Sequence, residues 1–236
     1  MTTIIGFGHR SRSGKDTAAA TIIEKYGTPY IHGQGNLKAL EASEDLGRGA
    51  GTVWGSNIRR YAFADALKRE VNTAAYLAGG MAKLITEEVN YGRIPIWVKY
   101  DPNAPMDDPL CPLGKQRLLL QWWGTDYRRS QDEDYWVKQL KKVVEQDKPE
   151  FALITDFRFP NEAKILDFKV KIERDVLIND HPSEHALDNF KDWDIVLLND
   201  SSVEALREKA IEAFEFIRDF VSGKNTFYDR QSGLPR

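Results

Sequence analysis

Two short stretches of this sequence combine residues that suit the binding of phosphate groups. The first, "GFGHRSRSGKDT" (residues 6–17), follows an apolar run and contains the pair Gly14-Lys15. A glycine- and serine-rich turn between a strand and a helix is typical of polyphosphate-binding loops, because the helix start presents N–H groups and glycine lets the backbone come close. Lys15 is placed to reach the β- and γ-phosphates. His9 stands where a glycine is usual, and Asp16 where Ser or Thr is usual.

The second stretch, "DFRF" (residues 156–159), follows the apolar run "FALIT" at 151–155. A carboxylate at the carboxyl end of a neighbouring parallel strand lies at the ligand-binding edge of the sheet. We expect Asp156 to orient Mg²⁺ or its waters, with Asp16 or Thr17 as a further contact, direct or through water. Arg158 is suited to cover the charge of a transferred phosphoryl group. The alternatives are a surface salt bridge for Asp156 or Arg158, and a plain tight turn at Gly14.

Strand and helix patterns alternate along the sequence around these groups. This alternation predicts a doubly wound, mostly parallel α/β sheet that positions them. Seven glycines between 27 and 57, and five prolines between 92 and 114, indicate insertions at 27–57 and 79–114 within a single domain spanning 1–236. A short strand is expected at 96–100 in the second insertion. The other expected strands are 3–7, 60–63, 151–155, 170–173 and 195–198, and the expected helices are 15–26, 65–77, 115–123, 134–146, 161–168 and 202–220.

Bulk composition excludes several classes of protein. The 236 residues carry 33 basic and 36 acidic side chains, a net charge of −3, which argues against a nucleic-acid coat or a membrane-surface protein. The apolar runs are far shorter than the roughly 20 residues that span a bilayer. The single cysteine, Cys111, cannot form an internal disulfide. A strand at the N-terminus leaves no room for a signal peptide, so we expect a cytoplasmic protein without nucleic-acid or membrane partners.

Six motifs occur in order along the chain: "RSGKDT" (12–17), "FADALKRE" (63–70), "RLLLQWWGTD" (117–126), "DYWVK" (134–138), "TDFRFPNEA" (155–163) and "NDSSVEAL" (199–206). Together they resemble the bacteriophage-type deoxynucleoside monophosphate kinases. The related animal-type phosphomevalonate kinases share the loop, the Asp-x-Arg element and an "SE…LDNF" segment, which is present at 183–190. The region around residues 117–138 looks more like the nucleotide kinases.

This resemblance implies a P-loop NTPase-like three-layer sandwich with a helical acceptor-binding insertion and a lid. It also implies ATP as phosphoryl donor, Mg²⁺ as cofactor and a deoxynucleoside 5′-monophosphate as acceptor, in the host cytoplasm if the protein is phage-encoded. A homodimer is left open. The expected catalytic residues are Lys15, Arg158, Asp156 and Arg12; those for ATP are Ser13, Gly14, Lys15, Asp16, Thr17, Asn199 and Asp200; those for the acceptor are Lys68, Arg117, Gln121 and Arg129; the lid residue is Arg174; and the metal contacts are Asp16, Thr17 and Asp156.

Several interpretations stay open on the residues alone. Trp122 and Trp123 could stack on a base or serve as core aromatics, and Arg128 stands beside Arg129. The segment from Asn199 could meet the adenine or simply cap the next helix through Ser201 or Ser202. The rival functions are a different small-molecule kinase, such as a phosphomevalonate kinase, and a nucleotide-binding module without transferase activity.

Overall fold

The computed structural model describes residues 1–27, 57–106, 114–175 and 182–224. The chain divides into two compact units, one formed by residues 1–61 and 147–236 and the other by 62–146. The predicted insertion at 27–57 lies almost wholly outside the described residues, as do Cys111 and most of the polar stretch that follows Arg174. The prediction of one kinase-like domain over the whole chain stays a prediction.

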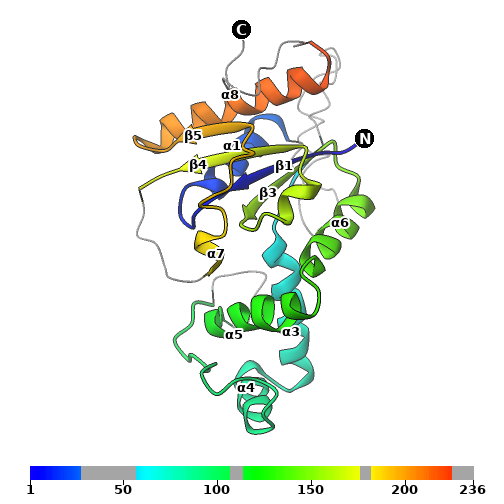
Figure 1. Cartoon of the computed structure of the whole chain (residues 1–236), viewed down its shortest axis with the longest axis vertical. Helices are drawn as coiled ribbons and strands as arrows, with labels where there is room; N and C mark the ends of the chain where they lie inside the picture. Colours follow the sequence, from blue (N-terminus) through cyan, green and yellow to red (C-terminus); the bar gives the residue numbers. More distant parts are fainter. Residues whose placement is uncertain (28–56, 107–113, 176–181, 225–236) are drawn as a thin grey trace, which may run out of the picture. The chain divides into compact units, whose positions relative to one another are not determined.

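The first unit contains a five-stranded sheet in which every neighbouring pair of strands is parallel. The strands lie in the order β2-β3-β1-β4-β5, so β1 is central (Figure 1). This arrangement confirms the predicted α/β class and agrees with a P-loop NTPase-like sandwich. The strands are β1 (Thr3–Gly8), β2 (Ile58–Tyr61), β3 (Phe151–Phe157), β4 (Phe168–Glu173) and β5 (Ile195–Leu198).

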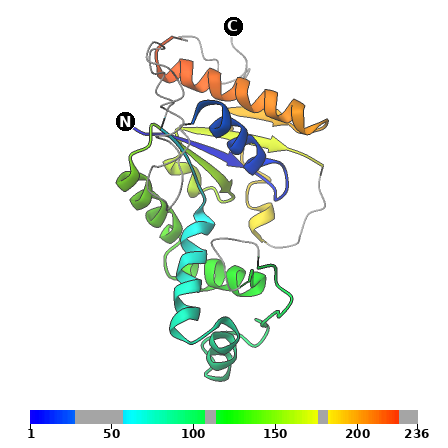
Figure 2. The same ribbon diagram turned by 180° about the vertical axis from the view of Figure 1, so that it is seen from behind.

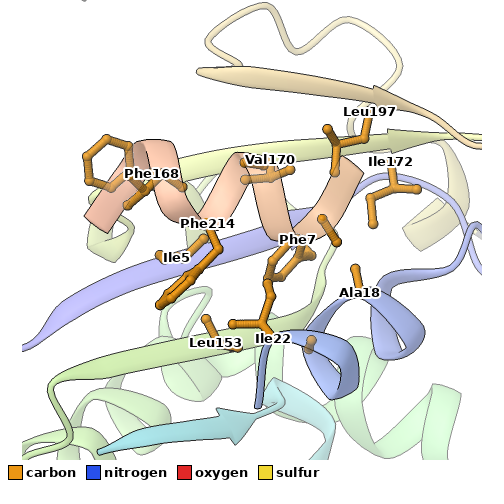
Figure 3. Close-up of a cluster of buried hydrophobic side chains, with 14 of the residues drawn as sticks. Ile5, Phe7, Ala18, Ile22, Leu153, Phe168, Val170, Ile172, Leu197 and Phe214 are labelled. Atoms are coloured by element: carbon orange, nitrogen blue, oxygen red, sulfur yellow. The ribbon is translucent and has the colours of Figure 1, made fainter. Parts of the chain in front are cut away.

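One face of the sheet is covered by α1 (Lys15–Tyr26) and α8 (Val203–Val221), which pack against each other (Figure 2). Residues of a strand alternate between faces, so Ile5 and Phe7 of β1 both point into this layer. Figure 3 shows them in a buried cluster with residues of both helices, among them Ala18, Ile22 and Phe214. The apolar stripes of α1 and α8 that the sequence shows are therefore their core faces.

On the other face of β1, Gly6 and Gly8 leave room for large side chains that lie directly over the strand. A Cβ atom on Gly6 would lie 2.3 Å from Cδ1 of Leu166, and one on Gly8 would lie 2.5 Å from Cδ1 of Phe157. Phe157 belongs to an aromatic cluster with Phe190 and Trp193. The 3₁₀ turn η2 (Glu162–Ile165) and the short helix α7 (Pro182–His185) belong to the same unit.

The second unit is helical in the part that the structure describes. Its core joins buried residues such as Val71, Leu84, Leu119 and Trp122 from several helices. The helices are α3 (Phe63–Leu77), α4 (Met81–Asn90), α5 (Arg117–Gln121), the π-helix η1 (Trp122–Arg129) and α6 (Tyr135–Asp147), whose last residue belongs to the first unit.

The structure corrects four details of the predicted elements. The helix expected at 161–168 is only the turn η2, because Phe168 pairs with Ile5 as the first residue of β4. The strand expected at 60–63 lies at 58–61, and Phe63 already begins α3. No strand forms at 96–100, where the chain turns through a hydrogen bond from Val98 N–H to Pro95 O (3.0 Å). The helix α4 was not predicted, although it lies in the region expected as an insertion.

Candidate phosphate-binding site

The loop between β1 and α1 has a backbone that only glycine fits at one position. Gly14 adopts a left-handed conformation, with φ of 110°, immediately before the first residue of α1. A Cβ atom there would lie 2.6 Å from Cδ2 of Leu206 and 2.9 Å from Nδ2 of Asn199. Gly14 has no side chain to cap the helix, so the N–H groups of the first turn of α1 face the loop with the positive end of the helix dipole. This is the local geometry that binds phosphate oxygens.

Lys15 is buried in this loop, with 6% of its surface exposed. Its Nζ donates to Arg10 O in a short contact, and to His9 O and Ser13 Oγ at 3.4 Å each. Burial, followed by the charge of Arg158, lowers the pKa of Lys15 from 10.5 to about 8, against the opposing effect of Glu184, Asp156 and Asp16. Lys15 is therefore a poorly solvated cation at neutral pH, and an anion that approached it would be strongly attracted.

At the carboxyl end of β3, the half-buried Asp156 is followed by Arg158. The side chain of Arg158 donates from Nη1 to Ser183 Oγ at 3.3 Å and forms a close ion pair with Glu184. The turn itself is held by the buried Glu162, whose Oε2 accepts the N–H groups of Arg158 (2.7 Å) and Phe159 (3.1 Å). Arg158 is thus held on both its backbone and its side chain.

Glu184, a residue that the sequence did not single out for a function, joins this turn to the phosphate loop. Its carboxylate is buried, and Oε2 accepts the N–H of Ser11 at 2.8 Å while Oε1 pairs with Arg158. Burial acts to raise the pKa of Glu184, but the Ser11 N–H and the charge of Arg158 outweigh it, so the pKa lies below its usual value. The only signal in the sequence was the "SE" pair of the segment at 183–190.

Asn199 holds the loop from the side of β5. Its Nδ2 donates to Ser13 O at 2.8 Å, and its backbone N–H donates to Glu173 O at 2.8 Å. Ser202 caps α8, since its Oγ accepts the N–H of Ala205 at 3.2 Å, so one of the two open interpretations of this segment is confirmed. Asp200 is exposed and accepts from Lys209 Nζ at 3.4 Å. Contact of Asn199 and Asp200 with adenine stays a prediction.

The residues expected to contact Mg²⁺ supply suitable oxygen atoms. Asp16 and Asp156 are both near enough to Lys15 to raise its pKa, and Thr17 follows Asp16 in the first turn of α1. Asp16 is exposed and forms an ion pair with Arg60 Nε at 3.5 Å. Among the described residues, no group of three or more His, Cys, Asp or Glu side chains is arranged so that it could hold a metal ion. Carboxylate and hydroxyl oxygens, completed by phosphate oxygens and water, match the preference of Mg²⁺, which uses one or two protein carboxylates at such sites.

Arg12 and Arg174 lie at the rim of the loop. Arg12 is exposed, with a left-handed φ of 59°, and its carbonyl accepts from Arg174 Nη1 at 3.5 Å. The chain beyond Arg174, expected to form a lid, lies outside the described residues from 176 to 181. The catalytic role of Arg12 and the lid role of Arg174 stay predictions.

The four residues expected to bind the acceptor all belong to the second unit. Lys68 is half-buried on α3, and Arg117 is exposed at the first position of α5. Gln121 ends α5 and is half-buried, so the predicted spacing of four residues from Arg117 lies within one helix. Arg129 ends the π-helix and donates from Nη1 to Glu133 O at 3.3 Å. Their role toward an acceptor stays a prediction.

Glu70 of α3 organises the π-helix, a feature that the sequence did not reveal. Its Oε1 accepts from Trp123 Nε1 (2.8 Å) and from Arg128 Nε (2.6 Å), and its Oε2 accepts from Tyr135 OH (2.8 Å). The guanidinium of Arg128 lies 4.9 Å from the ring centres of Tyr127 and Tyr135. Arg128 therefore has an internal partner in this unit.

Trp122 and Trp123 pack within this unit, in agreement with the interpretation that they are core aromatics. Trp122 is buried and stacks on Tyr127, with the ring centres 5.3 Å apart. Trp123 lies edge-on to both of these rings and donates to Glu70. π-Helices are rare and often occur at functional sites, so the residues of η1 are candidates for ligand binding.

Comparison with known proteins indicates a kinase-like relationship. No protein-family model matches the chain. A protein of Escherichia phage T5 named deoxynucleoside-5′-monophosphate kinase is 33% identical over 85 residues, which cover 30% of this chain and 34% of the phage protein. The similarity thus spans about a third of that kinase and indicates a kinase-like relationship. No helix in the described ranges is long and apolar enough to cross a bilayer.

Proposed function

We propose that this protein uses ATP to phosphorylate deoxynucleoside 5′-monophosphates to diphosphates. The observation that carries the proposal is the buried ammonium of Lys15, held in a loop whose Gly14 leaves the start of α1 open to phosphate. Loops of this kind, at the carboxyl edge of a parallel sheet, bind the phosphates of nucleotides. The named activity of the phage T5 relative supports the class of acceptor.

Phosphoryl transfer depends on positioning and on neutralising charge more than on covalent chemistry. Lys15 and Arg158 are suited to this because both are held in place by several protein contacts before a ligand arrives. The phosphate of a monophosphate acceptor is already anionic, so no catalytic base is required. When bound, Mg²⁺ would neutralise charge on the ATP phosphates, and Asp16, Thr17 and Asp156 would hold it.

We assign the acceptor to the second unit on the strength of its side chains. The guanidinium of Arg117 matches the geometry of a phosphate, and the amide of Gln121, one helical turn away, can pair with the edge of a base. Lys68 and Arg129 add positive charge for the same monophosphate. A phosphomevalonate acceptor has no base, so it would leave Gln121 without a partner in the substrate.

The direct test is an assay of acceptor-dependent ADP release with Mg²⁺ and ATP. The acceptors are the four deoxynucleoside monophosphates, the matching ribonucleotides and mevalonate phosphate. We expect turnover with at least one deoxynucleotide and none with mevalonate phosphate. Turnover with mevalonate phosphate alone would favour a phosphomevalonate kinase. A rate of ADP release that no acceptor changes would favour a nucleotide-binding module without transferase activity.

Substitution of the arginines tests the division between donor and acceptor sites. Arg158→Ala removes charge next to Lys15, so it should mainly lower kcat, by about 100-fold or more. Arg117→Ala should mainly raise KM for the monophosphate and leave KM for ATP within about twofold, because it removes a contact with the acceptor that is equally strong in the ground state and the transition state. Steady-state kinetics with each substrate varied in turn gives both values. A rise in KM for ATP alone in the Arg117 variant would show that the acceptor site is misplaced.

A further inference from the structure

Glu184 is a buried carboxylate whose two oxygens contact two different parts of the phosphate-binding site. Oε2 accepts the backbone N–H of Ser11 in the loop after β1, at 2.8 Å. Oε1 pairs with Nη1 of Arg158 in the turn after β3. The side chain of Glu184 is 5% exposed, whereas that of Arg158 is 29% exposed, so the arginine reaches solvent while its partner does not.

Such a buried carboxylate is costly to desolvate unless it is fully paired, and here both oxygens are paired. The pairing restricts the rotamers of Arg158, a side chain that is flexible when it is free. It also fixes the loop at Ser11, four residues before Lys15. Contacts within the protein therefore hold both elements in one geometry.

We infer that Glu184 is a positioning residue for phosphoryl transfer, which acts by holding Arg158 and the loop at Ser11 in the geometry that the phosphates require. The inference rests on the proposed function. Glu184 itself does not touch the phosphates, because its oxygens are occupied by protein donors and its charge would repel them. Its effect on catalysis passes through Arg158 and the loop.

A double-mutant cycle tests the action through Arg158. Glu184→Gln keeps the volume, but an amide has one acceptor oxygen and cannot serve both Ser11 and Arg158. We expect it to lower kcat by about 10- to 100-fold, the usual size for losing a group that orients a functional residue, and to change KM for ATP by less than about threefold. In an Arg158→Met background, the same change should lower kcat by a clearly smaller factor, because only the part of the effect that passes through the loop remains.

A matched control comes from the same segment. Asp188 is an exposed carboxylate whose partners are the side chains of His9, Arg10 and His185, rather than Arg158 or the N–H groups of the loop. Asp188→Asn removes the same charge and should leave kcat within about twofold. Equal losses of kcat from Glu184→Gln with and without Arg158 would overturn the inference, as would a loss matched by Asp188→Asn.

The second arm needs no catalytic activity, so it separates this inference from the proposed function. Hydrogen exchange of the Ser11 amide is followed by NMR in the nucleotide-free protein. Glu184→Ala removes the acceptor, and we expect exchange at least about tenfold faster than in the wild type, with Asp188→Asn unchanged. If Glu184→Ala does not fold, Glu184→Leu, which also lacks an acceptor and fills the space, replaces it.

The kinetic experiment and the exchange experiment together distinguish a failure of the positioning role from a failure of the proposed function. Unchanged exchange at Ser11 would overturn the positioning role even in an active kinase. A wild type that phosphorylates none of the acceptors would overturn the proposed function, and the exchange arm would still decide whether Glu184 holds the loop.

Discussion

Replacing Lys15 by methionine should make the protein more stable and inactive at the same time. Methionine has nearly the same length, so it fills the space of the lysine stem without a cavity. The ammonium is buried with 6% of the residue exposed, and burial is the main reason that its pKa falls from 10.5 to about 8. The fold therefore holds a charge that it disfavours.

The size of the effect follows from this pKa. A shift from 10.5 to about 8, at about 1.4 kcal/mol per unit, corresponds to about 3 kcal/mol of destabilisation by the charged form. Two of the three hydrogen bonds of Nζ are long, at 3.4 Å, and contribute little. Loss of the third, to Arg10 O, costs about 2 kcal/mol, because its donor is charged. Lys15→Met should thus raise the free energy of unfolding by about 1 kcal/mol at pH 7, while kcat falls by about 100-fold or more.

The pH dependence of stability tests independently whether the charge of Lys15 destabilises the fold. Between pH 8 and 10.5 the folded wild type releases the Lys15 proton while the unfolded chain still holds it, so wild-type stability rises with pH relative to the variant. The stability gap should be widest below pH 8 and shrink toward pH 10.5. Urea denaturation of both proteins across this range measures it, with Lys142→Met, an exposed position on α6, as a control that should change stability by less than about 0.5 kcal/mol. A Lys15→Met protein less stable than the wild type at pH 7 would refute the reasoning.

Two further substitutions test single structural features by denaturation. Gly14→Ala should cost about 1–2 kcal/mol for a left-handed alanine, plus about 1–3 kcal/mol for the clash with Leu206 and Asn199. Gly92→Ala is the control for the cost of the left-handed backbone alone, because Gly92 has a φ of 70° but nothing within 4 Å of a Cβ atom. Equal losses of stability in the two variants would show that the clash at Gly14 contributes nothing. Glu70→Gln should lower the stability of the unit around the π-helix by about 1–3 kcal/mol, since Arg128 loses its charged partner. Near-wild-type stability of this variant would show that the cluster does not depend on that charge.

The sequence by itself was sufficient for the elements whose signal is local. The glycine-lysine turn predicted the boundary between β1 and α1, and the apolar spacing of 202–220 predicted α8, because side-chain periodicity reflects the face that each element buries. The run at 151–155 predicted a buried parallel strand, which is β3, but the order β2-β3-β1-β4-β5 with β1 in the centre is a property of the tertiary structure. Local signals failed at 161–168, where helical residues gave way to a short turn because Phe168 gained more by pairing with β1.

Tertiary structure decided which polar and charged groups are hydrogen-bonded to one another. Ser11 and Glu184, or Ser13 and Asn199, are far apart in the chain, and nothing in their local sequence shows that they are hydrogen-bonded. The same holds for Glu70, which meets Trp123, Arg128 and Tyr135 only when α3, η1 and α6 come together. The strength of a charge pair depends on distance and burial, and both are set by packing rather than by residue type. The sequence thus determined which groups were available for phosphate chemistry, and the folded structure determined the partners that hold them in place.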